Sequence, residues 1–236
     1  MIEPIKWKDN KIVFIDQTEL PIRLRYTECR DIDALCEAIK KLRIRGAPLI
    51  GVAVGLGYAL AAFNSKEKTG TGLKKDLGRA SKKLRATRPT AVNLFWALKR
   101  MEDRFAALSM LNPAKIKRVI LKEALDILKE DKKMCVDIGR NGARLIKNSD
   151  VILTHCNAGI LATAGQGTAL SIIYEAKKQG KRFKVYADET RPLMQGSRLT
   201  MWELIRNSID ATLICDNMAT SVIKKKGVKK IIVGAD

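Results

Sequence analysis

Short apolar runs alternate with helical segments after Asp150, and this alternation constrains the fold more than any other feature of the sequence. Each run is followed by a polar or glycine-containing turn and then by a helix-like pattern, which is typical of βαβ units. Such units form a parallel sheet with right-handed connections. We therefore predict a Rossmann-like domain over residues 149–236, with strands at 151–153, 183–186, 212–214 and 231–233.

The first half of the chain has a different texture. It opens with two strand-like runs, 5–8 and 11–15, that are joined by Asp9 and Asn10, a pair suited to a hairpin turn. Apolar residues then recur at spacings of three and four over 32–42, 92–105 and 116–146. We expect an α/β protein in which residues 1–148 form a mainly helical domain with a small β-hairpin.

Polar residues follow each predicted strand of the second domain. In open parallel sheets ligands bind beyond the carboxyl ends of the strands. By this rule the ligand-binding residues are expected in four segments: 155–158, 188–192, 215–217 and 234–236. The last of these segments ends on Asp236, directly after a predicted strand that later elements would normally cover. We therefore expect the domain to be truncated at its carboxyl end.

The formal net charge is +20, which raises the question of nucleic-acid binding. The lysine pairs are dispersed along the chain and lack interleaved aromatic residues that would stack on bases. Solvated helix faces account for them, so we expect no specific nucleic-acid partner. Two uncharged stretches are long enough to raise the question of a membrane span. The stretch 46–65 contains Pro48, and the stretch 153–174 contains several polar residues, so both are expected to form a buried core.

Five cysteines are scattered through the chain and show no C-x-x-C spacing. This usage favours a reducing compartment over a zinc site or a disulfide framework. The amino-terminal residues include no apolar segment typical of a secretory signal. We therefore expect a cytoplasmic protein without a bound metal.

Two arginines each stand just before a predicted helix. Arg45, Gly46 and Ala47 lead into a glycine-rich helix, where backbone amides and a guanidinium could hold a phosphate. An ordinary helix start with a nearby proline would look the same. Arg88 stands before the helix at 92–105, and an arginine that extends along the surface of a helix start is the alternative interpretation there.

Cys156 follows the first predicted strand and opens a glycine-containing turn into a helix. Helix amides would stabilise its thiolate, whereas the neutral surroundings would oppose ionisation, so the charge state stays open. Taken alone, a buried cysteine is most often a small apolar core residue. His155 is the only histidine, but adjacent strand residues point to opposite faces, which disfavours a Cys–His pair.

Two further polar residues follow later strands. Gln195 can offer both a donor and an acceptor to sugar hydroxyls. For Asp216 we favour a plainer role, the cap of the helix that contains Met218.

These motifs together resemble the methylthioribose-1-phosphate isomerase family, and the resemblance runs in order through the whole chain. It is carried by residues 45–48, 88–94, 154–159, 189–192, 195–196, 216–219 and 233–236. The wider superfamily includes ribose-1,5-bisphosphate isomerase and regulatory subunits of translation initiation factor 2B. The pair Cys156 and Asp236 and the continuation Asn93 to Trp96 look like the methylthioribose enzyme.

The resemblance implies an aldose–ketose isomerase that acts on a small phosphorylated sugar as a homodimer and uses no cofactor. It implies that Asp236 donates a proton and that Cys156 stabilises the transition state or exchanges a proton. The substrate-binding residues that it implies are Arg45, Gly46, Ala47, Arg88 and Gln195. The family continues beyond its aspartate with an Asn-Lys pair that this sequence lacks, which puts the activity of the isolated chain in question.

Two rival functions stay open at this point. A non-catalytic regulatory protein of the initiation factor 2B type would share the fold, because fold alone does not separate function. A ribose-1,5-bisphosphate isomerase is the second rival.

Overall fold

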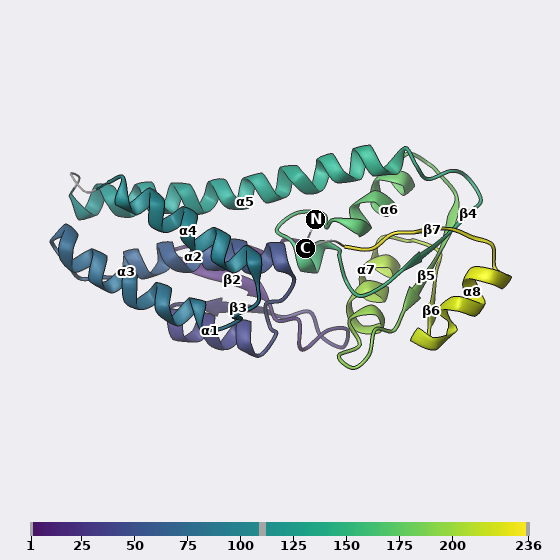
Figure 1. The fold of residues 1–236 in the computed structure, drawn as a ribbon, viewed down its shortest axis with the longest axis horizontal. Coiled ribbons are helices and arrows are strands. Elements are labelled where there is room, and N and C mark those ends of the chain that lie inside the picture. Colours follow the sequence, from purple (N-terminus) through teal and green to yellow (C-terminus); the bar gives the residue numbers. More distant parts are fainter. Residues whose placement is uncertain (1, 109–111, 235–236) are drawn as a thin grey trace. The chain divides into compact units, whose positions relative to one another are not determined.

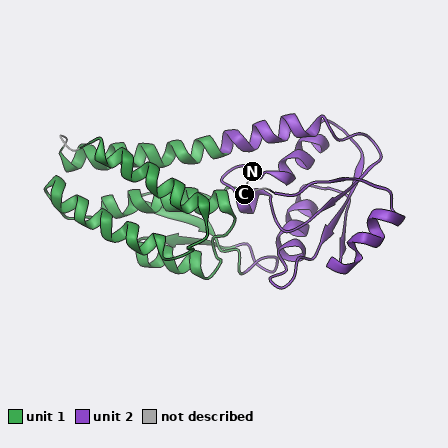
Figure 2. Ribbon diagram, viewed as in Figure 1, with its two compact units in different colours: residues 1–18, 25–131 green, residues 19–24, 132–236 purple. Residues whose placement is uncertain are grey.

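The computed structural model describes residues 2–108 and 112–234, and its chain divides into two compact units (Figures 1 and 2). Unit 1 comprises residues 1–18 and 25–131, and unit 2 comprises residues 19–24 and 132–236. The predicted domains, 1–148 and 149–236, follow the change in sequence pattern rather than spatial compactness, and they stay a prediction. The predicted α/β class and the order of a helical part before a parallel sheet are confirmed.

The hairpin that opens unit 1 forms as predicted. Strands β1 (Ile5–Lys8) and β2 (Lys11–Ile15) pair antiparallel, and Asp9 and Asn10 between them have φ of 49° and 57°. Positive φ at both central residues is the geometry of a two-residue turn whose twist matches the strands. A third strand, β3 (Tyr26–Cys29), pairs with β2, so the hairpin is part of a three-stranded sheet.

Helices make up the rest of unit 1. They are α1 (Ile32–Lys40), α2 (Ala47–Asn64), α3 (Gly70–Arg85), α4 (Val92–Ala106) and the first part of α5 (Pro113–Ala143). Helix α2 is the centre of this unit, since 72% of it is buried, and that burial accounts for its apolar composition. It is the one helix in the described part of the chain that is long and apolar enough to cross a membrane.

Unit 2 is built on a parallel sheet with the strand order β6-β5-β4-β7. Its strands are β4 (Asp150–Thr154), β5 (Phe183–Asp188), β6 (Ala211–Ile214) and β7 (Val228–Ile231). Its helices are the end of α5, α6 (Ala169–Lys178), α7 (Met201–Arg206) and α8 (Ala219–Lys225). Three of the four strands lie where the sequence pattern predicts them.

Aliphatic side chains from the strands pack against helices on both faces of this sheet. Ile152 and Val185 join one cluster with residues of α5, α6 and α7, for example Ile173 and Leu204. Leu153, Tyr186 and Ile214 form a second cluster with Val222 of α8. The alternation of Ile152 and Leu153 between two clusters is the period of two that a strand imposes.

The last strand begins earlier than the sequence predicts, at Val228 rather than at Ile231. The prediction of a strand at 231–233 followed the most apolar residues and discounted Lys229 and Lys230. Edge strands accept lysines, and Lys230 is fixed because its ammonium lies 2.6 Å from a carboxylate oxygen of Asp150, which is 2% exposed. The pair of Lys230 and Asp150 therefore helps to hold the edge strand β7 in place, where apolar side chains alone were expected to do so.

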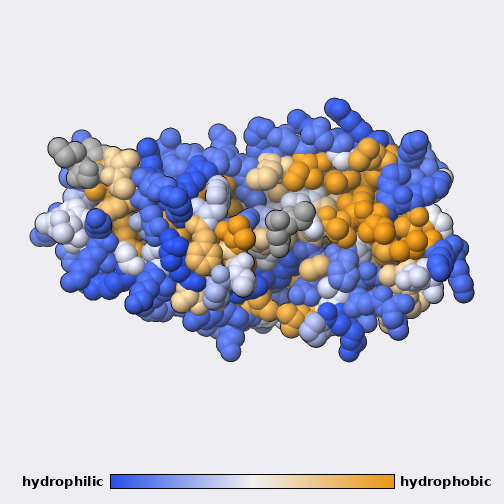
Figure 3. Space-filling model, in the orientation of Figure 1, coloured by the Kyte–Doolittle hydropathy of each residue, from blue (hydrophilic) through white to orange (hydrophobic). Residues whose placement is uncertain are grey.

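Hydrophilic side chains cover most of the outer margin of the face seen in Figure 3. Hydrophobic residues gather over the part of unit 2 that contains α6 and β7 (Figure 3). At this edge Ile231 is 58% exposed and Val233 is 53% exposed. Among the clustered lysines, Lys74, Lys75, Lys82 and Lys83 are exposed on the surface of α3.

The burial of α2 makes a direct prediction for stability. Leu60→Ala removes a side chain that is 0% exposed and leaves a cavity in unit 1, which should lower the free energy of unfolding by about 2–5 kcal/mol. Leu125→Ala, at a site in α5 that is 38% exposed, should cost about 1 kcal/mol or less. Urea unfolding followed by circular dichroism measures both, and equal losses would contradict this assignment of the core.

A candidate active site at the carboxyl ends of the strands

The parallel register of unit 2 brings the ends of its strands to one edge of the sheet. Thr154 at the end of β4 pairs with Ala187, and Asp188 at the end of β5 pairs with Ile214 of β6. The residues that follow these strands are consequently neighbours. They supply the hydrogen bonds that define the site.

Cys156 occupies a turn directly after β4 and has φ of 59°, a left-handed conformation that is costly for a residue with a side chain. Both of its peptide groups are held from other elements. Its backbone N–H donates to Thr190 Oγ1 at 2.8 Å, and its carbonyl accepts the hydroxyl of Thr200. These two threonines are 7% and 0% exposed. The left-handed turn is thus fixed by buried side chains, and Cys156 itself is half-buried.

A glycine-containing turn follows Cys156, as predicted, and the α-helix begins only after a further segment. Residues 159–167 form an excursion that contains a short 3₁₀ turn, Ile160–Ala162, and α6 begins only at Ala169. The excursion closes on itself, because the Ala158 carbonyl accepts the N–H groups of Thr168 and Leu170. Gly167 has φ of 92°, and a Cβ atom there would lie 2.5 Å from the Gly159 Cα atom, so glycine is required at this crossing.

Glu203 of α7 holds the start of this excursion, and the sequence analysis missed it. The residue is 1% exposed. Its carboxyl accepts hydrogen bonds from the Asn157 amide at 2.9 Å, the Ile160 N–H at 2.7 Å, the Leu161 N–H at 3.1 Å and the Tyr174 hydroxyl at 2.8 Å. Burial raises the pKa of Glu203 above its ordinary value, although these hydrogen bonds lower it.

One signal in the sequence could have revealed Glu203. It stands four residues after Leu199, which is 1% exposed. Glu203 therefore falls on the apolar face of its helical segment, where a carboxylate needs partners. A charged residue at such a position indicates a buried hydrogen-bond acceptor.

His155 pairs with Asp188 across the strand ends and not with Cys156. Its Nδ1 atom lies 2.9 Å from Asp188 Oδ2, a pair that the sequence analysis did not predict. The second oxygen, Asp188 Oδ1, is buried and has no hydrogen-bond partner among the residues that the structure describes. This side of the turn is therefore polar, and its polarity is separate from the Glu203 side.

Asp216 links two strand ends and does not cap the helix that follows it, so the predicted capping role is wrong. Its two carboxylate oxygens accept the backbone N–H groups of Thr190 and Arg191, both at 2.8 Å. The two amides that follow β5 therefore have carboxylate acceptors from the segment after β6. The Arg191 amide, together with the Thr190 amide and the nearby positive charges, lowers the pKa of Asp216.

Gln195 lies in the same neighbourhood and is half-buried. It immediately precedes a π-helical turn, Gly196–Thr200, that carries the threonine bonded to Cys156. A Cβ atom at Gly196 would lie 1.7 Å from the Asp188 carbonyl oxygen, so glycine allows this turn to approach the end of β5. Gln195 and Cys156 thus both belong to unit 2, and the helical turn that follows Gln195 carries the residue bonded to Cys156.

The remaining predicted binding residues lie in unit 1. Gly46 has φ of 93° and precedes the first residue of α2, and Arg45 beside it is half-buried. A Cβ atom at Gly51 of α2 would lie 3.2 Å from the Asn93 carbonyl oxygen, so the first turns of α2 and α4 are packed together. Arg45, Gly46 and Ala47 stand at the start of α2, and Arg88 precedes the start of α4.

Asp236 lies outside the described residues, so its predicted catalytic role is carried by the resemblance alone. Within the described part of the chain, His155, Asp188 and Asp216 place ligand atoms within 4.8 Å of one another. Asp216 already accepts two amide N–H groups and Asp188 pairs with the imidazole. The pairing within this group accounts for its geometry without a metal.

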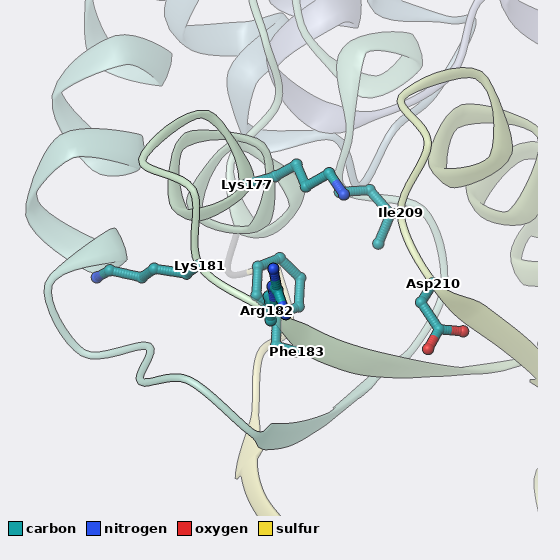
Figure 4. A pocket seen from close by; sticks show the side chains of 6 residues that line it. All are labelled: Lys177, Lys181, Arg182, Phe183, Ile209 and Asp210. Carbon is teal, nitrogen blue, oxygen red and sulfur yellow. The ribbon is translucent and has the colours of Figure 1, made fainter.

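A separate cavity of about 330 Å³ lies at the opposite end of β5, where Phe183 begins the strand (Figure 4). Its lining includes Lys177, Lys181, Arg182 and Asp210 (Figure 4). Ligands of parallel sheets bind at the carboxyl ends of the strands. We therefore place the candidate site at the Cys156 turn and not in this cavity.

The chain is similar to known proteins in sequence and in fold. The sequence profile of the initiation factor 2 subunit family matches residues 43–236. The 5-deoxyribose 1-phosphate isomerase of Moorella thermoacetica is 50% identical over 235 residues, which cover 100% of this chain and 67% of that protein. The methylthioribose-1-phosphate isomerase of Heliobacterium modesticaldum is 48% identical over 235 residues, covering 100% of this chain and 68% of that protein.

A solved structure shows the same fold. The crystal structure of 5-methylthioribose 1-phosphate isomerase from Pyrococcus horikoshii superposes with a TM-score of 0.94 at 39% identity, and the match covers 100% of this chain and 66% of that one. The chain thus spans about two thirds of the length of these relatives, 67% and 68% of the two sequences.

The lowered pKa of Asp216 predicts a pH-dependent contribution to stability. Because its pKa is lower in the folded than in the unfolded chain, the stabilisation is present above the unfolded value of ~3.9 and is lost as the pH falls through the folded value. Asp216→Asn should therefore destabilise the protein at neutral pH, and its difference from wild type should shrink below about pH 4. Urea unfolding over a pH series measures this difference.

The matched control is Asp210→Asn, which alters an exposed carboxylate of the same unit. It should change stability little at any pH in the series. If Asp216→Asn is less stable than wild type by the same amount at every pH, the ionised carboxylate of Asp216 is not what stabilises the fold.

Proposed function

The chain belongs to the initiation factor 2 subunit family, and from that premise we propose that it is an aldose–ketose isomerase of sugar 1-phosphates. The observation that carries the proposal is the Cys156 turn, in which a cysteine in left-handed conformation is held at the carboxyl end of a parallel strand by Thr190 and Thr200. A strained and fully anchored turn is typical of functional sites. The names of the relatives supply the reaction class.

The substrate that we propose is 5-methylthioribose 1-phosphate, which would become 5-methylthioribulose 1-phosphate in methionine salvage. The two relatives at 50% and 48% identity are named for different sugars, 5-deoxyribose 1-phosphate and methylthioribose 1-phosphate. Both sugars carry a 1-phosphate on a ribose and differ in the group at C5. The methylthio sugar is favoured by the resemblance of the motifs around Cys156 and Asn93 to the methylthioribose enzyme.

The reaction poses one chemical problem that the proposed residues address. Phosphate on the anomeric oxygen blocks ordinary ring opening to a free aldehyde, so the enzyme must help to break the C–O bond of the ring. We assign Asp236 as the acid that protonates the ring oxygen. The hydrogen then moves from C2 to C1, either through an enediol with Cys156 as acid and base or as a hydride. Solvent deuterium at C1 of the product distinguishes the two routes.

The binding roles follow from the resemblance and from the chemistry of each group. Arg45 and Arg88 offer guanidinium groups that suit a phosphate dianion, and the turn at Gly46 and Ala47 presents backbone amides at the start of α2. Gln195 offers a donor and an acceptor to sugar hydroxyls.

We propose further that the enzyme works in the cytoplasm as a homodimer. It would use no organic cofactor and no metal. It would bind neither membrane nor nucleic acid specifically. The absence of C-x-x-C spacing and the dispersion of the lysines support these points.

A regulatory protein of the initiation factor 2B type is the second candidate, because the family description and the charge of +20 favour it. RNA binding with a steep salt dependence and a sequence preference would support it, whereas uniform weak binding would not. Ribose-1,5-bisphosphate isomerase activity is a third candidate. Parallel assays with the three sugar phosphates separate it from the proposed function.

The proposed role of Cys156 predicts that Cys156→Ser will lower kcat for methylthioribose 1-phosphate by at least about 100-fold, because a serine hydroxyl is a far weaker acid than a thiol. The matched control is Cys215→Ser, which alters an exposed cysteine after β6 and should retain the activity of wild type. Turnover is measured by product formation under saturating substrate. Full activity of Cys156→Ser, or no turnover by the wild-type chain, would overturn the proposal.

A further inference from the structure

We propose that Thr200 and Glu203 are positioning residues, which fix the Cys156 turn so that the thiol faces the reacting carbons. The inference deepens the proposed function and rests on it, because it concerns the geometry of the proposed catalytic cysteine. Neither residue belongs to the set of binding and catalytic residues that the resemblance implies. Both lie within unit 2, in adjoining helical turns that end and begin at residues 200 and 201.

The first argument concerns the carbonyl of Cys156. A left-handed φ of 59° turns this peptide group away from the direction it would have in a continuing strand. The Thr200 hydroxyl donates to the carbonyl and also accepts the Asn157 side-chain amide at 3.2 Å. A single hydroxyl that is 0% exposed therefore joins two successive residues of the turn.

The second argument concerns the residues that follow. Glu203 accepts hydrogen bonds from Asn157 and from the backbone N–H groups of Ile160 and Leu161. A Cβ atom at Gly159 would lie 2.1 Å from a carboxylate oxygen of Glu203, so the backbone approaches this carboxyl closely. The turn is thus fixed from Cys156 to Leu161 by two side chains, one turn apart on the same helical segment.

The third argument concerns cost. A carboxyl group that is 1% exposed is expensive to bury unless its hydrogen bonds are made. An apolar residue of similar volume would fill the same space. Replacement of buried charged groups by such residues often leaves stability unchanged or raises it. The polar arrangement instead specifies one conformation of the backbone around Cys156. Misplacement of a reacting group by about 1 Å can cost about 100-fold in rate, which is the advantage such rigidity confers.

The experiment compares Thr200→Val, which keeps the shape and removes the hydroxyl, with Thr200→Ser, which keeps the hydroxyl. Thr200→Val should lower kcat by about 10- to 100-fold and leave KM nearly unchanged. The substrate contacts are unaffected, whereas the thiol of Cys156 is no longer held in position. Thr200→Ser should restore most of kcat. The matched control is Thr220→Val, an exposed site in α8, which should behave as wild type.

A second measurement reports on Cys156 without any turnover. In a Cys215→Ser background, the rate at which iodoacetamide alkylates Cys156 is followed by mass spectrometry. Thr200→Val should raise this rate because the turn is no longer held, whereas Thr200→Ser should not. If the wild-type chain fails to turn over sugar phosphates, the proposed function fails, and the alkylation rates still decide whether Thr200 positions the cysteine.

Two outcomes would overturn the inference. One is a Thr200→Val variant that retains both the kcat and the alkylation rate of wild type. The other is a Thr200→Ser variant that is as impaired as Thr200→Val, since the hydroxyl would then not be the group that acts. If Thr200→Val does not fold, Glu203→Gln replaces it. The amide of that variant cannot accept all the N–H groups of the turn, so it should show the same split between kcat and KM, and unchanged kinetics would contradict the role.

Discussion

The parallel register of β4, β5 and β6 is the constraint on which the candidate site depends. It places Thr154 beside Ala187 and Asp188 beside Ile214, so the segments that follow three strands meet at one edge of the sheet. The hydrogen bonds that hold Cys156 then come from residues that are distant in the sequence. A slip of one residue in β5 would turn every side chain of that strand to the other face, and the site would lose the groups that follow Asp188.

Two groups of polar side chains lie around the Cys156 turn. On one side Glu203 is buried and its pKa is raised by that burial, while its hydrogen bonds fix the backbone after Cys156. On the other side His155 and Asp188 form a polar pair, and Asp216 lies close to them. Buried polar groups such as Glu203, whose hydrogen bonds are made, specify a unique local structure. Such groups provide the preorganisation that catalysis requires.

Local patterns in the sequence predicted the hairpin at Asp9 and Asn10 and three of the four strands, because turn chemistry and apolar runs act over a few residues. They failed where a long-range pair decided the outcome. Lys230 is part of β7 because it meets Asp150, and Asp216 bonds the amides after β5 in preference to its own helix. The helical pattern around Glu203 could have indicated a buried acceptor, but only the folded chain shows that its partners are in the Cys156 turn. The helix start after Gly46, by contrast, could be predicted from the local sequence.

The measurement that tests the central claim most directly is protection of Cys156 by substrate. Iodoacetamide labels the half-buried Cys156 and the exposed Cys215 of the same chain, so each molecule carries its own reference. If the Cys156 turn is the site of a sugar 1-phosphate isomerase, methylthioribose 1-phosphate will slow the labelling of Cys156 in a saturable manner and leave that of Cys215 unchanged. Labelling of Cys156 at the same rate with and without saturating methylthioribose 1-phosphate would contradict the account.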